Sequence, residues 1–151
     1  MDSPAKNGCR PAPARIVVVD DEAVARQNLG HALGKEGHIV RLARDGRQAL
    51  DLLAEEPAEV VVSDLRMERV DGQALLAAVR ERHPGTAFIL VTGYATVDSA
   101  LAAMKDGAVH YLAKPLDLDE VRRAVREILA LRALRAGLAA PCPLQSETER
   151  A

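Results

Sequence analysis

Five short apolar runs, each followed by a segment with helical periodicity, constrain the fold of this chain more than any other feature. The runs are residues 15–19, 38–43, 59–63, 87–91 and 109–113. The third contains the consecutive β-branched residues Val60, Val61 and Val62, a composition typical of a strand buried on both faces. Strands that alternate with helices form parallel sheets covered by helices on both faces. The sequence therefore predicts a single α/β domain with a doubly wound five-stranded parallel sheet.

The segments between the runs have the spacing and end signals of helices. The first carries an apolar face at i, i+4, i+7 and i+8, and the fourth carries another; the residues are Ala25, Leu29, Ala32 and Leu33, and Val97, Ala100, Leu101 and Met104. Gly37 and Gly107 are placed to end these two helices. Asp71-Gly72 is a predicted cap and turn before the third helix, and Asp117 with Glu120 has the spacing of a capping box.

Composition sets the limits of the folded region and narrows the function classes. We expect residues 1–14 to be a flexible leader, residues 15–130 the folded domain, and residues 131–151 a helix extension with a disordered tail or linker. A net charge of -2 gives no reason to expect direct nucleic-acid or membrane binding. No apolar stretch is long enough to span a bilayer, and we expect a cytoplasmic protein.

Polar residues follow four of the five apolar runs. Asp20 and Asp21 follow the first run, Asp64 the third, Thr92 the fourth and Lys114 the fifth. The carboxyl ends of parallel strands share one edge of the sheet, so these side chains should converge there. Crowded carboxylates raise one another's pKa, and a divalent cation such as Mg²⁺ relieves their repulsion. We expect Asp64 and Asp21 to bind Mg²⁺ directly and Asp20 to act through a water.

Each of these residues has a simpler explanation when it is taken alone. An Asp-Asp pair is more often a helix cap, Thr92 an ordinary strand end, and Lys114 a solvated lysine. Their joint placement at one sheet edge favours a shared site. The four histidines have no metal-ligand spacing, and we interpret them as surface or edge residues: His31, His38, His83 and His110.

On these residues the chain resembles the receiver domains of bacterial two-component response regulators, over residues 15–130. The match consists of Asp20-Asp21, Asp64, Thr92-Gly93 and Lys114-Pro115, each at its strand end. Residues 63–67 and 90–96 are most similar to receivers of nitrogen-regulation-type sigma-54-dependent activators. The resemblance implies a flavodoxin-like sheet with strand order 2-1-3-4-5. One departure is Glu68 after Met67, where the family usually has proline.

The resemblance also implies a function, a phosphorylation-controlled signalling switch and not an enzyme. Asp64 would accept a phosphoryl group from a partner histidine kinase, with Mg²⁺ as cofactor, and lose it slowly. The implied residues are catalytic Asp64, Thr92 and Lys114; metal-binding Asp20, Asp21, Asp64 and the backbone carbonyl of Arg66; phosphate-binding Thr92, Gly93 and Lys114; and the switch pair Thr92 and Tyr111. Pro115 allows a cis peptide bond after Lys114.

Tyr111 is equally well explained as a half-buried strand residue without a switching role. A haloacid-dehalogenase-type phosphohydrolase is an alternative that also uses an aspartyl phosphate, but its DxD pattern is missing after the first strand. An unphosphorylated docking domain would leave the acidic residues unexplained.

Two further expectations concern the output of the switch and its self-association. We expect the output to be transcription, exerted through a domain outside these residues. Leu131, Leu134 and Leu138 form a second apolar stripe beyond the part of the last helix that covers the sheet. We therefore expect a homodimer, formed either through this helix or through the face made by the fourth helix, the fifth strand and the fifth helix.

Overall fold

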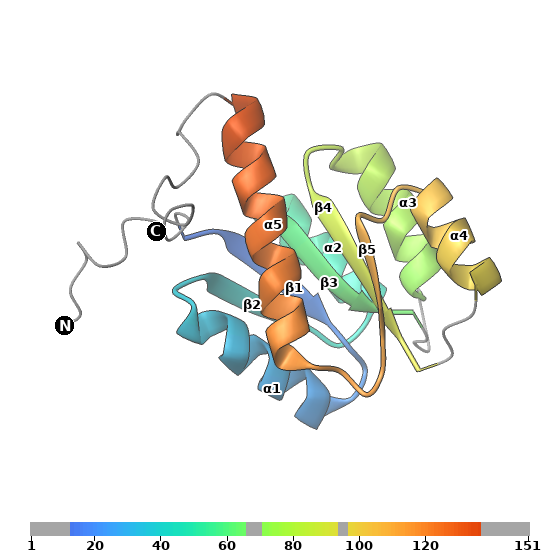
Figure 1. The fold of residues 1–151 in the computed structure, drawn as a ribbon, viewed down its shortest axis with the longest axis horizontal. Helices are drawn as coiled ribbons and strands as arrows, with labels where there is room; N and C mark the ends of the chain where they lie inside the picture. The colour runs from blue at the N-terminus through green and yellow to red at the C-terminus, as the bar shows by residue number, and fades with distance from the viewer. Residues whose placement is uncertain (1–12, 66–70, 94–96, 137–151) are drawn as a thin grey trace, which may run out of the picture.

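The computed structural model describes residues 13–65, 71–93 and 97–136. In this part of the chain, strands and helices alternate as the sequence predicted (Figure 1). The elements are β1 (Arg15–Val19), α1 (Ala23–Lys35), β2 (Ile39–Ala43), α2 (Gly46–Glu55), β3 (Val60–Asp64), α3 (Gly72–Arg82), β4 (Ala87–Thr92), α4 (Val97–Lys105), β5 (His110–Ala113) and α5 (Leu118–Ala136). All paired strands are parallel, in the order β2-β1-β3-β4-β5, which confirms the predicted topology.

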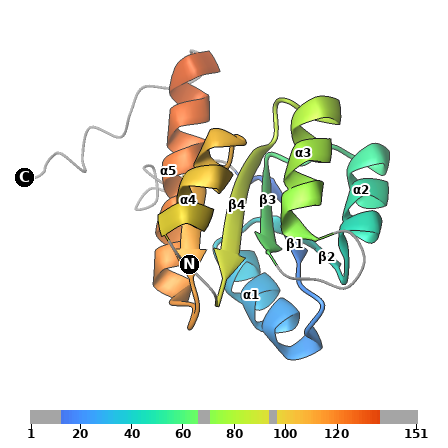
Figure 2. The same ribbon diagram turned by 90° about the vertical axis from the view of Figure 1, so that its right-hand side faces the viewer.

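Two apolar layers hold the helices on opposite faces of the sheet. Helices α1 and α5 cover one face, where Leu33 and Val125 pack against Ile16 and Val18 of β1. Helices α2, α3 and α4 cover the other face, onto which Val17 and Val19 project. Successive residues of a strand point to opposite faces, so a run of valines serves both layers. The strands point toward one common edge of the sheet (Figure 2).

Aspartate side chains accept hydrogen bonds from backbone amides at the starts of three helices at that edge. The carboxylate of Asp45 accepts a hydrogen bond from the Gln48 amide at the start of α2, and that of Asp71 accepts one from the Ala74 amide at the start of α3. Asp117 bonds the Asp119 amide at the start of α5. Helix α1 differs, because its N-cap makes no side-chain hydrogen bond.

The structure corrects three details of the sequence analysis. Strand β3 runs from Val60 to Asp64, one residue later at each end than the predicted 59–63, so Asp64 is the last residue of the strand. On α4, Leu101 and Met104 are exposed at 64% and 48%, whereas Ala103 is buried. His38 is buried and not at the surface, and its Nδ1 accepts a hydrogen bond from the backbone amide of Ala14 at 3.2 Å.

The last helix continues beyond the sheet. Leu131 and Leu134 are both about half exposed, as the second stripe predicted, while Leu138 lies outside the described residues. Among the helices of the described residues, none combines the length and the apolar character needed to cross a membrane. Of the buried polar side chains in the described residues, those at the carboxyl ends of the strands are Asp20, Ser63, Asp64 and Thr92.

Candidate functional site

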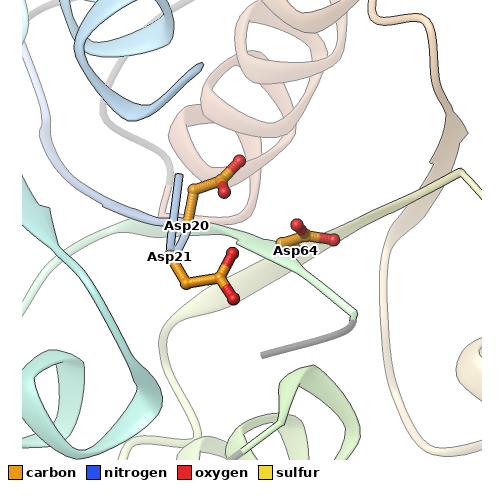
Figure 3. A group of neighbouring side chains, drawn as sticks. All are labelled: Asp20, Asp21 and Asp64. Carbon is orange, nitrogen blue, oxygen red and sulfur yellow. The ribbon is translucent and has the colours of Figure 1, made fainter. Parts of the chain in front are cut away.

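Three carboxylates meet at the ends of β1 and β3 (Figure 3). Each of Asp20, Asp21 and Asp64 has a carboxylate oxygen within 4.8 Å of those of the other two. The strand register brings them together, because Val19 lies opposite Ser63 and the next residues are Asp20 and Asp64. Asp20 and Asp64 are buried and Asp21 is exposed. The predicted acidic group therefore forms, with one of its members open to solvent.

Lys114, directly after β5, adds a positive charge to this group of carboxylates. Its Nζ donates a hydrogen bond to Asp64 Oδ2 at 3.0 Å and lies 3.8 Å from Asp20 Oδ2. The backbone amide of Lys114 bonds the carbonyl of Thr92 at 2.8 Å, which keeps the ends of β4 and β5 together. The peptide bond between Lys114 and Pro115 is cis, as proline at this position allows.

Thr92 and Gly93 lie beside this amine. Thr92 is fully buried at the end of β4, and Gly93 is exposed. A Cβ built on Gly93 would come within 3.9 Å of the Lys114 Cβ, so the Lys114 stem passes next to the Gly93 backbone. Asp64 pairs with Val91, which places Thr92 one residue beyond the carboxylate on the adjacent strand.

A hollow of about 170 Å³ lies at the strand ends. Its polar wall includes Asp20, Asp64 and Lys114, and its apolar wall includes Leu29 and Leu116. An apolar wall lowers the local dielectric, so each charge in the hollow acts more strongly than it would in water.

Burial is the main reason that the pKa of Asp20 is raised above its usual value. The hydrogen bond from the Glu22 amide at 2.9 Å, and the charge of Lys114, oppose this rise. Repulsion from Asp64 and Asp21 adds to the rise but contributes less than burial. The expected repulsion between carboxylates therefore acts in the predicted direction, with loss of hydration as the larger cause.

The pKa of Lys114 is raised as well. Burial of the amine acts to lower this pKa, but the hydrogen bond and charge of Asp64, with the charges of Asp20 and Glu22, outweigh it. Lys114 therefore stays positively charged at neutral pH.

The donor set suits a hard divalent cation. Carboxylate oxygens are the ligands that Mg²⁺ takes in proteins, and this ion usually keeps several waters. The exposed carboxylate of Asp21 leaves room for those waters, and a cation would offset the cost of burying Asp20 and Asp64. The remaining expected metal ligand, the carbonyl of Arg66, lies outside the described residues, as do Met67 and Glu68.

We expect Asp20→Asn to stabilise the protein at pH 7 in the absence of divalent metal, by about 1 kcal/mol. A carboxyl whose pKa is higher in the folded chain than its unfolded value of 3.8 binds protons preferentially when folded. Its contribution to stability is then lost as the pH rises through the raised pKa. The asparagine lacks this charge, so its advantage should be largest at neutral pH and shrink toward pH 4.

Urea unfolding of both proteins at pH 7 and pH 4.5 measures this difference. Asp21→Asn is the control, because the Asp21 carboxylate is exposed and should give a smaller change. An Asp20→Asn protein that is less stable than the parent at pH 7 would contradict the expectation.

Sequence reasoning missed two residues that shape this site. Gly72, which we interpreted only as a turn, lies against the Asp64 backbone: a Cβ there would be 2.4 Å from the Asp64 carbonyl oxygen. Arg26 of α1 donates a hydrogen bond from Nη1 to the carbonyl of Asp20 at 2.8 Å. Both contacts depend on approach in space, which leaves no periodic signal in the sequence.

Comparison with known proteins agrees with this geometry. Residues 16–126 match the family model of the response regulator receiver domain. Regulatory protein AtoC of Escherichia coli is 39% identical over 121 residues, covering 80% of this chain and 26% of that protein. The DNA-binding transcriptional regulator NtrC of Escherichia coli is 38% identical, over 73% of this chain and 24% of its own length. The chain thus spans about a quarter of each of these two relatives.

Solved structures give the same result. A response regulator receiver domain protein from Clostridium thermocellum superposes with a TM-score of 0.76 at 31% identity, covering 81% of this chain and 98% of the other. NtrX from Brucella abortus gives a TM-score of 0.78 at 29% identity, over 84% of this chain and 29% of its own. The sheet order, the acidic group at the carboxyl edge and the family match over most of the length lead to one conclusion: the chain belongs to the response regulator receiver domain family.

Proposed function

We propose that this domain is a phosphorylation-controlled switch in which Asp64 accepts a phosphoryl group from a histidine of a partner kinase. The observation that carries the proposal is the contact between the Lys114 amine and Asp64 at 3.0 Å, inside a group of three carboxylates. A carboxylate beside a cationic amine can act as a nucleophile toward phosphorus.

The reaction forms one bond and breaks another. A carboxylate oxygen of Asp64 attacks the phosphorus, a P–O bond forms, the P–N bond to the kinase imidazole breaks, and the imidazole leaves with the electron pair. Catalysis of this kind depends on positioning and on charge neutralisation. Lys114 neutralises one phosphoryl oxygen, while the Thr92 hydroxyl and the backbone amide of Gly93 bind others. The Leu65 amide is already donated to the Val91 carbonyl at 2.8 Å. Mg²⁺, held by Asp20, Asp21 and Asp64, supplies further positive charge to the phosphoryl oxygens when it is bound.

Phosphorylation would change the face formed by α4, β5 and α5. Leu90 pairs with Tyr111, so Thr92, two residues further along β4, lies on the same face of the sheet as the tyrosine ring. A phosphoryl group adds about -1.5 to -2 charges and new acceptor oxygens beside Thr92. We propose that Thr92 turns toward these oxygens and that Tyr111 repacks into the space, which shifts the population between two arrangements of this face.

Thr92→Ala should therefore accept phosphate but lose the phosphorylation-dependent change in self-association. The alanine cannot donate a hydrogen bond to the phosphoryl group, so the signal is no longer passed to Tyr111. Sedimentation of the protein with and without a phosphoryl donor measures this change in self-association. Thr86→Ala is the matched control, because Thr86 directly precedes β4 and Thr92 ends it. A Thr92→Ala protein that responds like the parent would contradict the switch.

The proposal extends to partners and output. The name of NtrC describes a DNA-binding transcriptional regulator, and we propose that this domain likewise controls transcription through a further domain. We propose that this protein is cytoplasmic and that a sensor histidine kinase is the phosphoryl source. Self-association would use either the stripe that includes Leu131 and Leu134 or the face with Leu101 and Met104, all of them exposed. We propose no direct nucleic-acid contact by this chain.

Intact mass after incubation with a small acyl phosphate and Mg²⁺ tests the proposed function. We expect one phosphoryl group per chain, lost slowly, and none when Mg²⁺ is removed with a chelator. Continuous release of phosphate over many turnovers would instead identify a phosphohydrolase, and an unchanged mass with Mg²⁺ would identify a domain that is not phosphorylated.

A further inference from the structure

A cationic side chain of α1 contacts the backbone of the loop that carries Asp20 and Asp21. Arg26, half-buried on the first turns of α1, donates from Nη1 to the Asp20 carbonyl at 2.8 Å. Its own backbone amide bonds the Glu22 carbonyl at 3.0 Å. Arg26 does not line the hollow at the strand ends, so its contact with the site is through the Asp20 carbonyl.

Asp20 is held at every polar group. Its amide donates to the Ala43 carbonyl at 3.1 Å, and its Oδ1 accepts from the Glu22 amide at 2.9 Å. Its Oδ2 faces Lys114 at 3.8 Å, and Arg26 holds its carbonyl. Rotation of the backbone at Asp20 would break several of these contacts together. The directions in which Asp20 and Asp21 point are therefore set by this small network.

The N-terminus of α1 lacks the side-chain cap that α2 and α3 have. Helices α2 and α3 begin with aspartates whose side chains cap the first turn. Helix α1 begins at Ala23, its N-cap Glu22 gives no side-chain cap, and three acidic residues in succession, 20–22, repel one another there. Arg26 does not replace the missing acceptor, but it brings a positive charge to these acidic residues and a charge-assisted bond to the Asp20 carbonyl, and such bonds are stronger than neutral ones.

We propose that Arg26 is a positioning residue that preorganises the acidic pair for a divalent cation. It fixes the Asp20 carbonyl, which keeps the carboxylates of Asp20 and Asp21 directed at the point where Asp64 also lies. Second partners that orient metal ligands in this way typically change metal affinity by 10–100-fold when they are removed. This inference rests on the proposed function only in so far as Mg²⁺ is the cation bound.

Arg26→Ala should weaken Mg²⁺ binding about tenfold in calorimetric titration, and Arg26→Lys, which keeps one charged donor, should restore part of the affinity. Arg47→Ala is the matched control, because Arg47 lies on the first turn of α2 and makes only an exposed pair with Asp51 at 3.8 Å. The control should bind Mg²⁺ like the parent. Unchanged Mg²⁺ affinity in Arg26→Ala, or equal losses in the alanine and lysine variants, would overturn the proposal.

Hydrogen exchange of the metal-free protein separates this inference from the proposed function. The Glu22 amide, which bonds Asp20 Oδ1, should exchange about fivefold faster in Arg26→Ala than in the parent, while amides of β3 stay protected. If the parent binds no Mg²⁺ but this local acceleration appears, the tether stands and the proposed function fails. If the Glu22 amide exchanges at the parental rate, the tether itself is wrong.

Discussion

Asp64→Asn is expected to abolish phosphoryl acceptance. A neutral amide oxygen is a poor nucleophile, so no acyl phosphate forms, although the asparagine oxygen can still accept the hydrogen bond that Lys114 donates at 3.0 Å. The substitution also removes one of the crowded carboxylates, which should leave the fold intact. Intact mass after treatment with an acyl phosphate and Mg²⁺ should match the untreated protein, with an unchanged circular dichroism spectrum.

Asp71→Asn is the matched control for this experiment. It makes the same change of charge at an exposed aspartate near the site, and asparagine also caps helices well, so α3 should keep its first turn. The control should gain one phosphoryl group per chain, as the parent should. A phosphoryl group found on Asp64→Asn would show that another side chain is the acceptor, and Asp20 and Asp21 would be the next to replace.

Gly72→Ala is expected to destabilise the domain by about 3 kcal/mol. The added Cβ would lie 2.4 Å from the Asp64 carbonyl oxygen and 2.8 Å from the Leu65 Cα. Both are backbone atoms at the end of a buried strand, so they cannot move aside as a flexible side chain would. The Gly72 amide also bonds the Leu65 carbonyl at 2.8 Å, so the start of α3 cannot withdraw without losing that bond.

The same displacement should reach the site, because the carbonyl that is pushed belongs to Asp64. We therefore expect a loss of phosphoryl acceptance together with the loss of stability, measured by urea unfolding and intact mass. Gly34→Ala is the control of opposite sign: nothing lies within 4 Å of the added Cβ, and alanine favours a helix by up to about 1 kcal/mol. A Gly72→Ala protein as stable as the parent would show that this contact relaxes.

Helix α4 shows where sequence periodicity stops being informative. Its larger apolar residues, including Leu101 and Met104, suggested the packed side, yet Ala103 is buried while these two are exposed. Alanines occur on several sides of this short helix, so hydrophobicity does not tell which of them packs against the sheet. The space available against the sheet, and not hydrophobicity alone, therefore decides which side of α4 faces inward.

The sequence by itself determined the order of strands and helices along the chain and the residues that stand at the strand ends, whereas the strand order in the sheet was implied by the resemblance to receiver domains. The first two features are local, since periodicity and capping act over a few residues and parallel strands share one carboxyl edge. Only the tertiary structure decided that Asp20 and Asp64 are buried while Asp21 is exposed, and that Arg26 and Gly72 contact the site. Burial and close contact depend on the three-dimensional path of the backbone, both between distant segments and within single turns, and a linear pattern does not contain the resulting distances.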